Sequence, residues 1–523
     1  MLTIHFFQPS AAICSRSISH LAGLAVIILC AGSHWASAAS GEWSSPDSGS
    51  WSTPKNWASK VVADGAGFTA KFDGIPKSGL TVTLDSSRTI GHLIFNDLTD
   101  APGESWILRG DAAAGNKLTL AGPSPTIYVE KTAPQRHIIL DVDLAGTGGF
   151  KKTGPGVLIV EASTTCTGPI LIEDGTISIG LPAGSFFSQG TQAGTITINN
   201  SGVLFFNRSN VFGLGASPVA ITINAGASVS NHNVFNVLNN LHLNGGRLFA
   251  QGGQDGGSQA FALGGTVAVG GEGASSITSS PNYNSHTGIH LGSTTAADRG
   301  TTFEVADVTG SPVADLTVSA VLMSTWGAEA AGDLTKTGPG TMALSAANTY
   351  MGNTAIVAGT LALVGEGSIS SSSGISIARG ATWDVSEATK GGTVVSGQKL
   401  SGEGRVLGST TFAAGSQLSI GPGPFTFAGE LILSPGSVTE IRLPAAGKPE
   451  AVAGGIAARK IQFGGTLVLV FPEGFSTTGT TKLFDFKSGD KNFEVVKAIG
   501  LAPGLAARFD PLTGSVSVVS AAK

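Results

Sequence analysis

Charged residues are scarce in this sequence. Asp, Glu, Lys and Arg make up 12% of its 523 residues, against about 25% in an average soluble protein. A composition this poor in charge excludes a charge-rich disordered chain. It also leaves few carboxylates and basic groups from which a catalytic site or a network of ion pairs could be built.

Cysteine and long apolar runs are also nearly absent. Cys14 and Cys30 lie in an N-terminal segment that we predict to be cleaved, which leaves Cys166 as the single thiol of the mature chain. One thiol cannot form an internal disulfide, so stability must come from apolar burial and backbone pairing. After that segment no run approaches the roughly 18 continuous apolar residues of a membrane helix. We therefore expect no membrane-spanning segment in the mature chain.

Residues 1–38 have the layout of a secretory signal peptide. Arg16 precedes the apolar run at 21–32, which is too short to cross a bilayer, and the Ala-Ser-Ala sequence at 36–38 suits a signal peptidase. Cleavage removes one basic residue and leaves 29 basic against 35 acidic residues, a net charge of about −6. That balance argues against nucleic acid and anionic membranes as partners. We predict export to the periplasm, the cell surface or the medium.

Glycine, by contrast, is abundant, with 75 residues in the chain. It has no collagen-like period and stands between short Val, Ile, Leu and Thr runs, which indicates many short strands joined by tight corners. The strongest pattern is a repeat. The stretch at 151–179 returns without a gap at 335–363, an offset of 184 residues.

Both copies of the repeat share their turn residues. We expect each Pro-Gly pair to occupy the two central positions of a type II turn, because proline fixes φ near −65° and glycine accepts a positive φ. A strand follows each turn, at 157–160 and at 341–344. In the strand that comes after it, apolar and polar residues alternate, which places residues such as Ile177 and Leu361 on one face. The structural turn residues that the repeat predicts are Gly154, Pro155, Gly156, Gly175, Gly338, Pro339, Gly340 and Gly359.

A weaker form of the same sequence pattern, a glycine followed by alternating apolar positions, recurs along the chain. The glycine intervals from 156 to 175, 175 to 194, 226 to 246, 246 to 265, 340 to 359 and 359 to 380 are 19, 19, 20, 19, 19 and 21 residues. A recurrence near twenty indicates a solenoid. The period is too short for a pair of helices and suits one coil of short strands, with coils stacked roughly 4.8 Å apart around apolar columns.

The stretch LTKTGPGTMALSAANTYMGNTAIVAGTLAL at 334–363 resembles the autotransporter-associated β-strand repeat, also called the passenger-associated transport repeat. Members of that family read approximately L-T-K-x-G-x-G-T-L-x-L, then N-T-Y-x-G and a closing G-T-L. The first copy departs from this pattern at Cys166, which stands where the second copy has Tyr350. The resemblance implies a right-handed parallel β-helix on a secreted protein of a Gram-negative bacterium. It implies no activity, because the repeat is a scaffold.

We therefore predict an all-β fold, a right-handed parallel β-helix or solenoid, in four parts. Residues 1–38 are the signal peptide and 39–145 an N-terminal Trp-rich β cap. Residues 146–445 are the β-solenoid, with the repeats at 149–179 and 333–363, and 446–523 are a C-terminal β region.

Four early tryptophans, Trp43, Trp51, Trp57 and Trp106, have two interpretations. Flat indole rings stack on sugars, so these residues could form a glycan-binding surface. The interpretation that we favour is that they plug the open end of the solenoid, where an apolar interior and unpaired strand edges would otherwise meet water.

Other polar patterns are weaker. Asp141 and Asp143 sit at i and i+2 on one strand face, roughly 7 Å apart, which suits a calcium ligand pair, two glycosidase carboxylates or a solvated corner. His286 and His290 have the spacing of a zinc site only on a helix, and Gly288 between them favours a loop or strand. Spacing alone assembles no Ser, His and Asp set. We therefore predict no catalytic residue, no metal and no cofactor.

These observations favour an exported, non-catalytic β-solenoid that acts as a structural or adhesive element at the cell surface or outside the cell. The alternative is a polysaccharide-binding or polysaccharide-cleaving β-helix that holds an extended glycan in a groove along one face. Extracellular polysaccharide and cell-envelope components are the partners that both interpretations suggest. No pattern predicts an oligomeric state.

Overall fold

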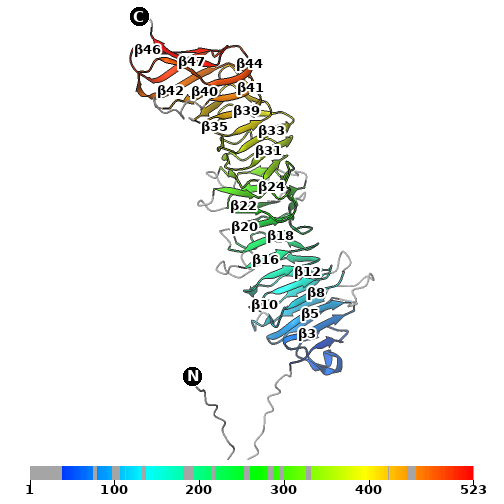
Figure 1. The fold of residues 1–523 in the computed structure, drawn as a ribbon. Helices are drawn as coiled ribbons and strands as arrows, with labels where there is room; N and C mark the ends of the chain where they lie inside the picture. Colours follow the sequence, from blue (N-terminus) through cyan, green and yellow to red (C-terminus); the bar gives the residue numbers. More distant parts are fainter. Residues whose placement is uncertain are drawn as a thin grey trace, which may run out of the picture. The chain divides into compact units, whose positions relative to one another are not determined.

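Two long parallel β-sheets run through the chain, and the chain passes repeatedly from one to the other, with one or two consecutive strands in each. In the second repeat, β28 (Asp333–Thr337) and β30 (Asn353–Ile356) belong to the first sheet, while β29 (Thr341–Leu344) and β31 (Thr360–Gly365) belong to the second. β28 pairs in parallel with β30, and β29 with β31. Figure 1 shows successive strands lying one above another. The predicted parallel β-helix is confirmed.

The computed structural model describes residues 38–521, and these belong to the compact unit Ala38–Lys523. Within that range the residues not described are 75–78, 97–105, 112–113, 132–136, 181–193, 214–217, 252–258, 281–286, 294–298, 325–330, 422 and 445–454. The predicted signal peptide therefore lies, apart from Ala38, outside the described residues.

The elements are nearly all strands. The other strands of the first sheet are β1 (Gly41–Trp43), β3 (Gly65–Asp73), β5 (Arg88–Asn96), β7 (Lys117–Leu120), β8 (Thr126–Val129), β10 (Asp143–Gly146), β11 (Phe150–Thr153), β13 (Thr164–Cys166), β14 (Ile170–Ile172), β16 (Thr195–Ile198), β18 (Ala220–Asn224), β20 (Asn236–Asn244), β22 (Gln259–Val269), β24 (Thr287–Leu291), β25 (Gly300–Val305), β27 (Leu322–Met323), β32 (Gly374–Ile377), β35 (Lys399–Gly402), β38 (Gln417–Ile420), β40 (Val438–Arg442), β42 (Thr466–Phe475) and β45 (Val495–Leu501).

The second sheet has a similar series. Its other strands are β2 (Gly49–Ser50), β4 (Leu80–Leu84), β6 (Trp106–Gly110), β9 (Ile138–Asp141), β12 (Val157–Val160), β15 (Thr176–Ile179), β17 (Val203–Phe206), β19 (Ser228–His232), β21 (Arg247–Gln251), β23 (Ser275–Ser279), β26 (Leu316–Val318), β33 (Thr382–Ala388), β34 (Gly392–Val394), β36 (Arg405–Leu407), β37 (Thr410–Phe412), β39 (Phe425–Leu433), β41 (Ile456–Gln462) and β44 (Phe484–Asp490).

A small antiparallel sheet is formed by strands near the C-terminal end of the chain. It contains β43 (Gly479–Lys482), β46 (Leu505–Asp510) and β47 (Ser515–Ser520). Two short 3₁₀ helices, η1 (Pro54–Asn56) and η2 (Ala58–Lys60), stand near the beginning. The described residues contain no α-helix.

Alternation along each strand builds the interior. Leu158 of β12 pairs with Ile177 of β15, and Met342 of β29 pairs with Leu361 of β31, and all four side chains are buried. Parallel pairing in register stacks such residues into columns, because every inward position lies over the inward position of the previous coil. The result is one continuous apolar core with members from Trp43 to Val518.

Four of the six glycine intervals found in the sequence separate strands that pair directly, so each corresponds to one whole coil. The other two do not. The interval from 340 to 359 separates β29 from β31, which pair directly. The interval from 175 to 194 instead separates β15 of the second sheet from β16 of the first, and that from 246 to 265 separates β21 from β22 in the same way. A glycine followed by alternation precedes strands of both sheets, so spacing alone does not distinguish a whole coil from part of one.

The predicted type II turns are wrong. The left-handed residues are Gly154 (φ 75°) and Gly338 (φ 74°), which stand before the prolines, whereas Gly156 and Gly340 lie outside the left-handed region. Gly156 is required for a different reason. A Cβ atom there would overlap the carbonyl oxygen of Glu130 on the preceding coil. The second glycine of each turn therefore permits close contact between coils.

Candidate functional site

The repeat turns enclose a buried lysine, which the sequence analysis had not recognised as a structural group. Lys152 of the first repeat is 0% exposed, and its Nζ donates to the carbonyl oxygens of Thr153 (3.0 Å), Gly154 (2.7 Å) and Asp174 (3.1 Å). Three donors thus meet three acceptors. Two of the acceptors belong to the turn itself and the third to the turn of the next coil, so the ammonium group joins consecutive coils.

Lys336 repeats this arrangement in the second repeat. It is also 0% exposed, and its Nζ donates to the carbonyl oxygens of Thr337 (2.8 Å), Gly338 (2.9 Å) and Ala358 (3.1 Å). Burial lowers the pKa of Lys152 and of Lys336 to about 8, with Asp174 and Asp315 respectively acting in the opposite direction. We refer to each lysine with its three carbonyls as a lysine clamp.

The clamps predict a rise in stability above pH 8. Because each lysine pKa is lower in the folded protein than its usual 10.5, the unfolded chain binds more protons in this window, and the free energy of unfolding increases with pH. We expect about 1 kcal/mol per lysine between pH 8 and pH 9. Burial raises the pKa of the Cys166 thiol, which opposes the rise by a smaller amount.

Chemical denaturation at pH 8 and pH 9 measures this effect. The single variants Lys152→Met and Lys336→Met should each show about half of the wild-type rise, since each keeps one clamp. A wild-type free energy of unfolding that falls between pH 8 and pH 9, or variants with an undiminished rise, would contradict the assignment.

A buried carboxylate supports the second clamp. Asp315 is 1% exposed, and its Oδ1 accepts from the backbone N–H groups of Val308 and Thr309 (2.8 Å each), while Oδ2 accepts from that of Thr341 (2.7 Å). Burial alone would raise the pKa of Asp315, but the hydrogen bonds from Thr341, Thr309 and Val308 outweigh it and lower the pKa. Asp315 therefore connects the 308–309 loop to the start of β29.

Asparagines form a second polar connection between coils. Asn224 Nδ2 donates to Asn199 Oδ1 (2.6 Å), and Asn244 Nδ2 donates to Asn224 Oδ1 (3.1 Å). Asn199 in turn donates to Glu173 Oε2 (3.0 Å). In the sequence, an asparagine follows the last apolar residue of three successive strands of the first sheet. That pattern could have predicted this connection.

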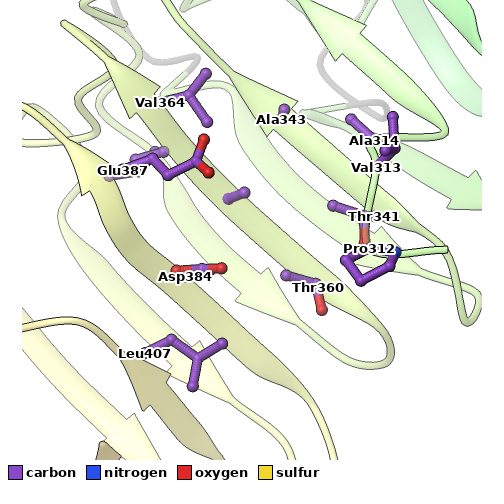
Figure 2. A pocket seen from close by; sticks show the side chains of 12 residues that line it. Pro312, Val313, Ala314, Thr341, Ala343, Thr360, Val364, Asp384, Glu387 and Leu407 are labelled. Atoms are coloured by element: carbon purple, nitrogen blue, oxygen red, sulfur yellow. The ribbon is translucent and has the colours of Figure 1, made fainter. Parts of the chain in front are cut away.

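The outer face of the second sheet carries a groove of about 530 Å³, and we take this groove as the candidate functional site. Its floor consists of small outward-facing side chains on paired strands, including Ala343 of β29 and Ala362 of β31. Figure 2 shows the loop at 312–314 along one side and Glu387 along the other. The lining residues are Pro312, Val313, Ala314, Thr341, Ala343, Thr360, Ala362, Leu363, Val364, Asp384, Glu387 and Leu407.

A β-bulge gives the groove two carboxylates. Ala362 pairs with Asp384 and Val364 pairs with Glu387, so β33 has one more residue than β31 between these points. Residues three apart on a regular strand face opposite sides, and the extra residue instead lets both carboxylates line one groove. Asp384 Oδ1 accepts from the N–H and hydroxyl of Ser386 (2.9 and 2.6 Å), which fixes one carboxylate oxygen.

The groove suits a ligand that lies along the surface of the protein, and it does not enclose a small molecule. Small alanine and threonine side chains line much of it, and Val313 at its edge is 65% exposed. The two carboxylates can accept hydrogen bonds from hydroxyl or ammonium groups of a ligand lying across the strands. Among the residues that the structure describes, no cluster of three or more His, Cys, Asp or Glu side chains could hold a metal ion.

The four tryptophans named from the sequence lie in the interior. Trp43, Trp51, Trp57 and Trp106 are 4%, 0%, 2% and 3% exposed. The first three surround Phe72 of β3, with ring centroids of Trp51 and Trp57 5.0 Å apart. The indole N–H of each of these four residues donates to a backbone carbonyl. Stacking on a sugar needs an exposed indole face, whereas these faces contact one another and the core.

Asp141 and Asp143 lie on different sheets, and only one histidine of the pair lies in the described residues. Asp141 forms an ion pair with Arg109 across adjacent coils (2.8 Å), and Asp143 lies on β10 of the other sheet. His290 lies on β24, with its Nδ1 2.6 Å from the Ser324 carbonyl oxygen, and His286 lies outside the described residues. No helix in the described part of the chain is long and apolar enough to cross a membrane.

Comparison with known proteins agrees with this geometry. The passenger-associated-transport-repeat family matches residues 150–179 and 334–363, the segments that contain the two lysine clamps. The chain contains two passenger-associated transport repeats. A stretch of 126 residues is 32% identical to the adhesin BmaC autotransporter of Brucella suis biovar 1 (strain 1330). That match covers 24% of this chain and 3% of the adhesin, and no solved structure matches the chain.

The passenger-associated transport repeats differ from the rest of the solenoid in their turns. Both place a lysine ammonium group under a Gly-Pro-Gly turn, and both have a later glycine, Gly175 or Gly359, against the carbonyl oxygens of that turn. A short motif thus specifies one coil and its contact with the next. In its repeats and its fold the chain is passenger-like.

Proposed function

We propose that this chain is an exported, non-catalytic β-solenoid that acts as a structural and adhesive passenger-like element at the cell surface. The observation that carries the proposal is the pair of passenger-associated transport repeats, built with the same clamp into one parallel β-helix. The similarity of 126 residues to an autotransporter adhesin supports the adhesive part. Residues 1–38 supply the export signal in this proposal.

The physical properties of the solenoid suit such a role. Each coil contacts its neighbours through backbone pairing, so the structure can be extended by adding coils and presents long outer faces. The polar groups described above hold coils together, namely the buried lysine clamps, the buried Asp315 and the partly buried asparagines Asn199, Asn224 and Asn244. In this proposal Trp43, Trp51 and Trp57 plug the first coil, and the groove on β29, β31 and β33 is an adhesive contact.

Attachment of cells tests the proposal. Producing cells should display the chain to external antibody and protease, and should bind to host-cell or polysaccharide surfaces more strongly than cells from which its gene is deleted. We expect Asp384→Asn/Glu387→Gln to reduce attachment several-fold with the protein still displayed. Asp47→Asn/Glu42→Gln, which changes two carboxylates outside the groove, serves as the control.

Two results would contradict the proposal. Cells that keep the chain inside, with no access for external protease, would remove the surface role. Release of new reducing ends or unsaturated sugars, when the purified protein is incubated with a panel of polysaccharides, would show catalysis and would favour the polysaccharide-cleaving alternative.

A further inference from the structure

Near the C-terminal end of the second sheet, two cations stand side by side without carboxylate partners. Ala458 pairs with Phe486 and Lys460 pairs with Ser488, so Arg459 of β41 and Lys487 of β44 lie opposite each other on adjacent coils. Both side chains are exposed. Like charges directly opposite on neighbouring strands repel each other, so the fold gains no stability from this pair.

Two carboxylates line grooves beside these cations, and both are paired with other cations. Glu430 Oε1 accepts from Lys460 Nζ at 2.7 Å, and Asp485 Oδ1 accepts from Lys482 Nζ at 2.7 Å. In the part of the chain that the structure describes, Arg459 and Lys487 form no ion pair. Two positive charges are therefore left available to a ligand on one outer face.

These cations project into hollows of the surface. Arg459 and Lys487 line two adjoining grooves, of about 410 and 280 Å³, along β39, β41 and β44. A bulge between Phe427 and Glu430 shifts the register of β39 beside them. Bulges of this kind redirect side chains and occur often beside binding sites.

The larger groove has an apolar floor. Ala428, Ala457 and Ala458 line it together with Phe486, which is only partly buried and packs edge-to-face against Phe463. The smaller groove adds the hydroxyl groups of Ser409 and Ser488. A flat apolar surface beside hydroxyl groups and two cations matches a sugar ring that carries a carboxylate, since the ring has an apolar C–H face, hydroxyl groups and a negative charge.

We propose that these two grooves bind an acidic polysaccharide, with Arg459 and Lys487 contacting sugar carboxylates and Phe486 contacting the C–H face of a ring. The inference rests on the proposed function in taking a surface glycan as the partner. The overall negative charge of the chain disfavours nucleic acid, because the long-range field repels a polyphosphate while a local cation pair still attracts single carboxylates.

Binding to polygalacturonic acid tests this inference. The purified full chain should bind polygalacturonic acid in a salt-sensitive manner and should not bind uncharged dextran. Arg459→Ala/Lys487→Ala should weaken binding about tenfold or more. The control Lys399→Ala/Arg405→Ala removes the same charge from exposed positions outside the grooves, and should change the affinity less than about twofold. Thermal unfolding of both variants checks that they remain folded.

Three outcomes would overturn the inference: no binding of polygalacturonic acid at low salt, an equal loss in the control variant, or binding of double-stranded DNA as tight as that of polygalacturonic acid. The attachment experiment remains separate. Cells that display Arg459→Ala/Lys487→Ala and still attach to host cells would leave the proposed function intact, whereas loss of surface display would remove the proposed function without affecting the binding measured on purified protein.

Discussion

Gly359→Ala is expected to lower the free energy of unfolding by about 4 kcal/mol. Gly359 has a φ of +66°, and a Cβ atom there would lie 2.5 Å from the carbonyl oxygens of Gly338 and Gly340 in the turn of the preceding coil. Neither oxygen can move away easily, because the Gly338 carbonyl accepts a hydrogen bond from Lys336 and the Gly340 carbonyl accepts one from the Thr360 N–H. The substitution therefore combines backbone strain with a clash between coils.

Gly380→Ala is the matched control for this prediction. Gly380 also has a positive φ, +83°, but nothing lies within 4 Å of the position that its Cβ would take. We expect a loss of only about 1 to 2 kcal/mol there, from the left-handed conformation alone. Guanidinium unfolding followed by circular dichroism measures both variants. Equal losses would show that close contact between coils does not restrict Gly359.

Lys336→Met is the second substitution with a large expected effect. Methionine keeps the length and the apolar stem of the side chain but removes the ammonium group, so the carbonyl oxygens of Thr337, Gly338 and Ala358 lose their shared donor. Buried acceptors without a donor are costly, and we expect a loss of about 3 kcal/mol at pH 7. Lys152→Met should behave alike, since its three contacts are equivalent.

Lys390→Met provides the control for the clamp. The Lys390 side chain is 83% exposed and lies 3.9 Å from Glu366, so removing its charge should change the free energy of unfolding by less than about 0.5 kcal/mol. A Lys336→Met variant as stable as wild type would mean that apolar packing compensates for the lost hydrogen bonds and that the lysine does not join the coils.

Local signals in the sequence were sufficient to predict the architecture. Strands were expected at 157–160 and 341–344, and β12 and β29 have these bounds. Glycine corners and two-residue alternation are properties of a few consecutive residues, so they can be recognised in the sequence without knowledge of the fold. Because these signals are local, the glycine intervals 175 to 194 and 246 to 265 look like whole coils in the sequence, although similar patterns there begin strands of different sheets.

The polar groups that join coils could not be predicted in this way. The role of Lys336 depends on the Ala358 carbonyl, 22 residues away, and that of Asp315 on the Thr341 N–H, 26 residues away. Such partners are fixed only when the register between coils is known. The repeat did contain a hint, because the lysine is retained in both copies together with the Thr-Gly-Pro-Gly sequence that follows it.

The candidate groove depends on register as well. Strict alternation places Asp384 and Glu387 on opposite faces of a strand, and only the bulge in β33 brings them into one groove. The tryptophans show a different limit. Their number and position near the beginning of the chain fitted either an exposed sugar-binding surface or an end plug, and composition contains no information on which side of the backbone each indole lies.

Spin-label distances along one column of the second sheet test the stacking of coils most directly. Thr341 pairs with Thr360, which pairs with Thr382, and the series continues one coil at a time through Arg405, Thr426, Ala457 and Asp485. One nitroxide is placed at Thr341→Cys, and the second at Arg405→Cys, Thr426→Cys, Ala457→Cys or Asp485→Cys. The distance between the two labels should be roughly 14 Å for the Arg405→Cys pair and should increase by roughly 4.8 Å with each further coil. Cys166 is buried, and Cys14 and Cys30 are replaced by serine. Narrow distributions with equal steps are the expected result, and distances that do not increase with the number of coils would contradict the parallel β-helix.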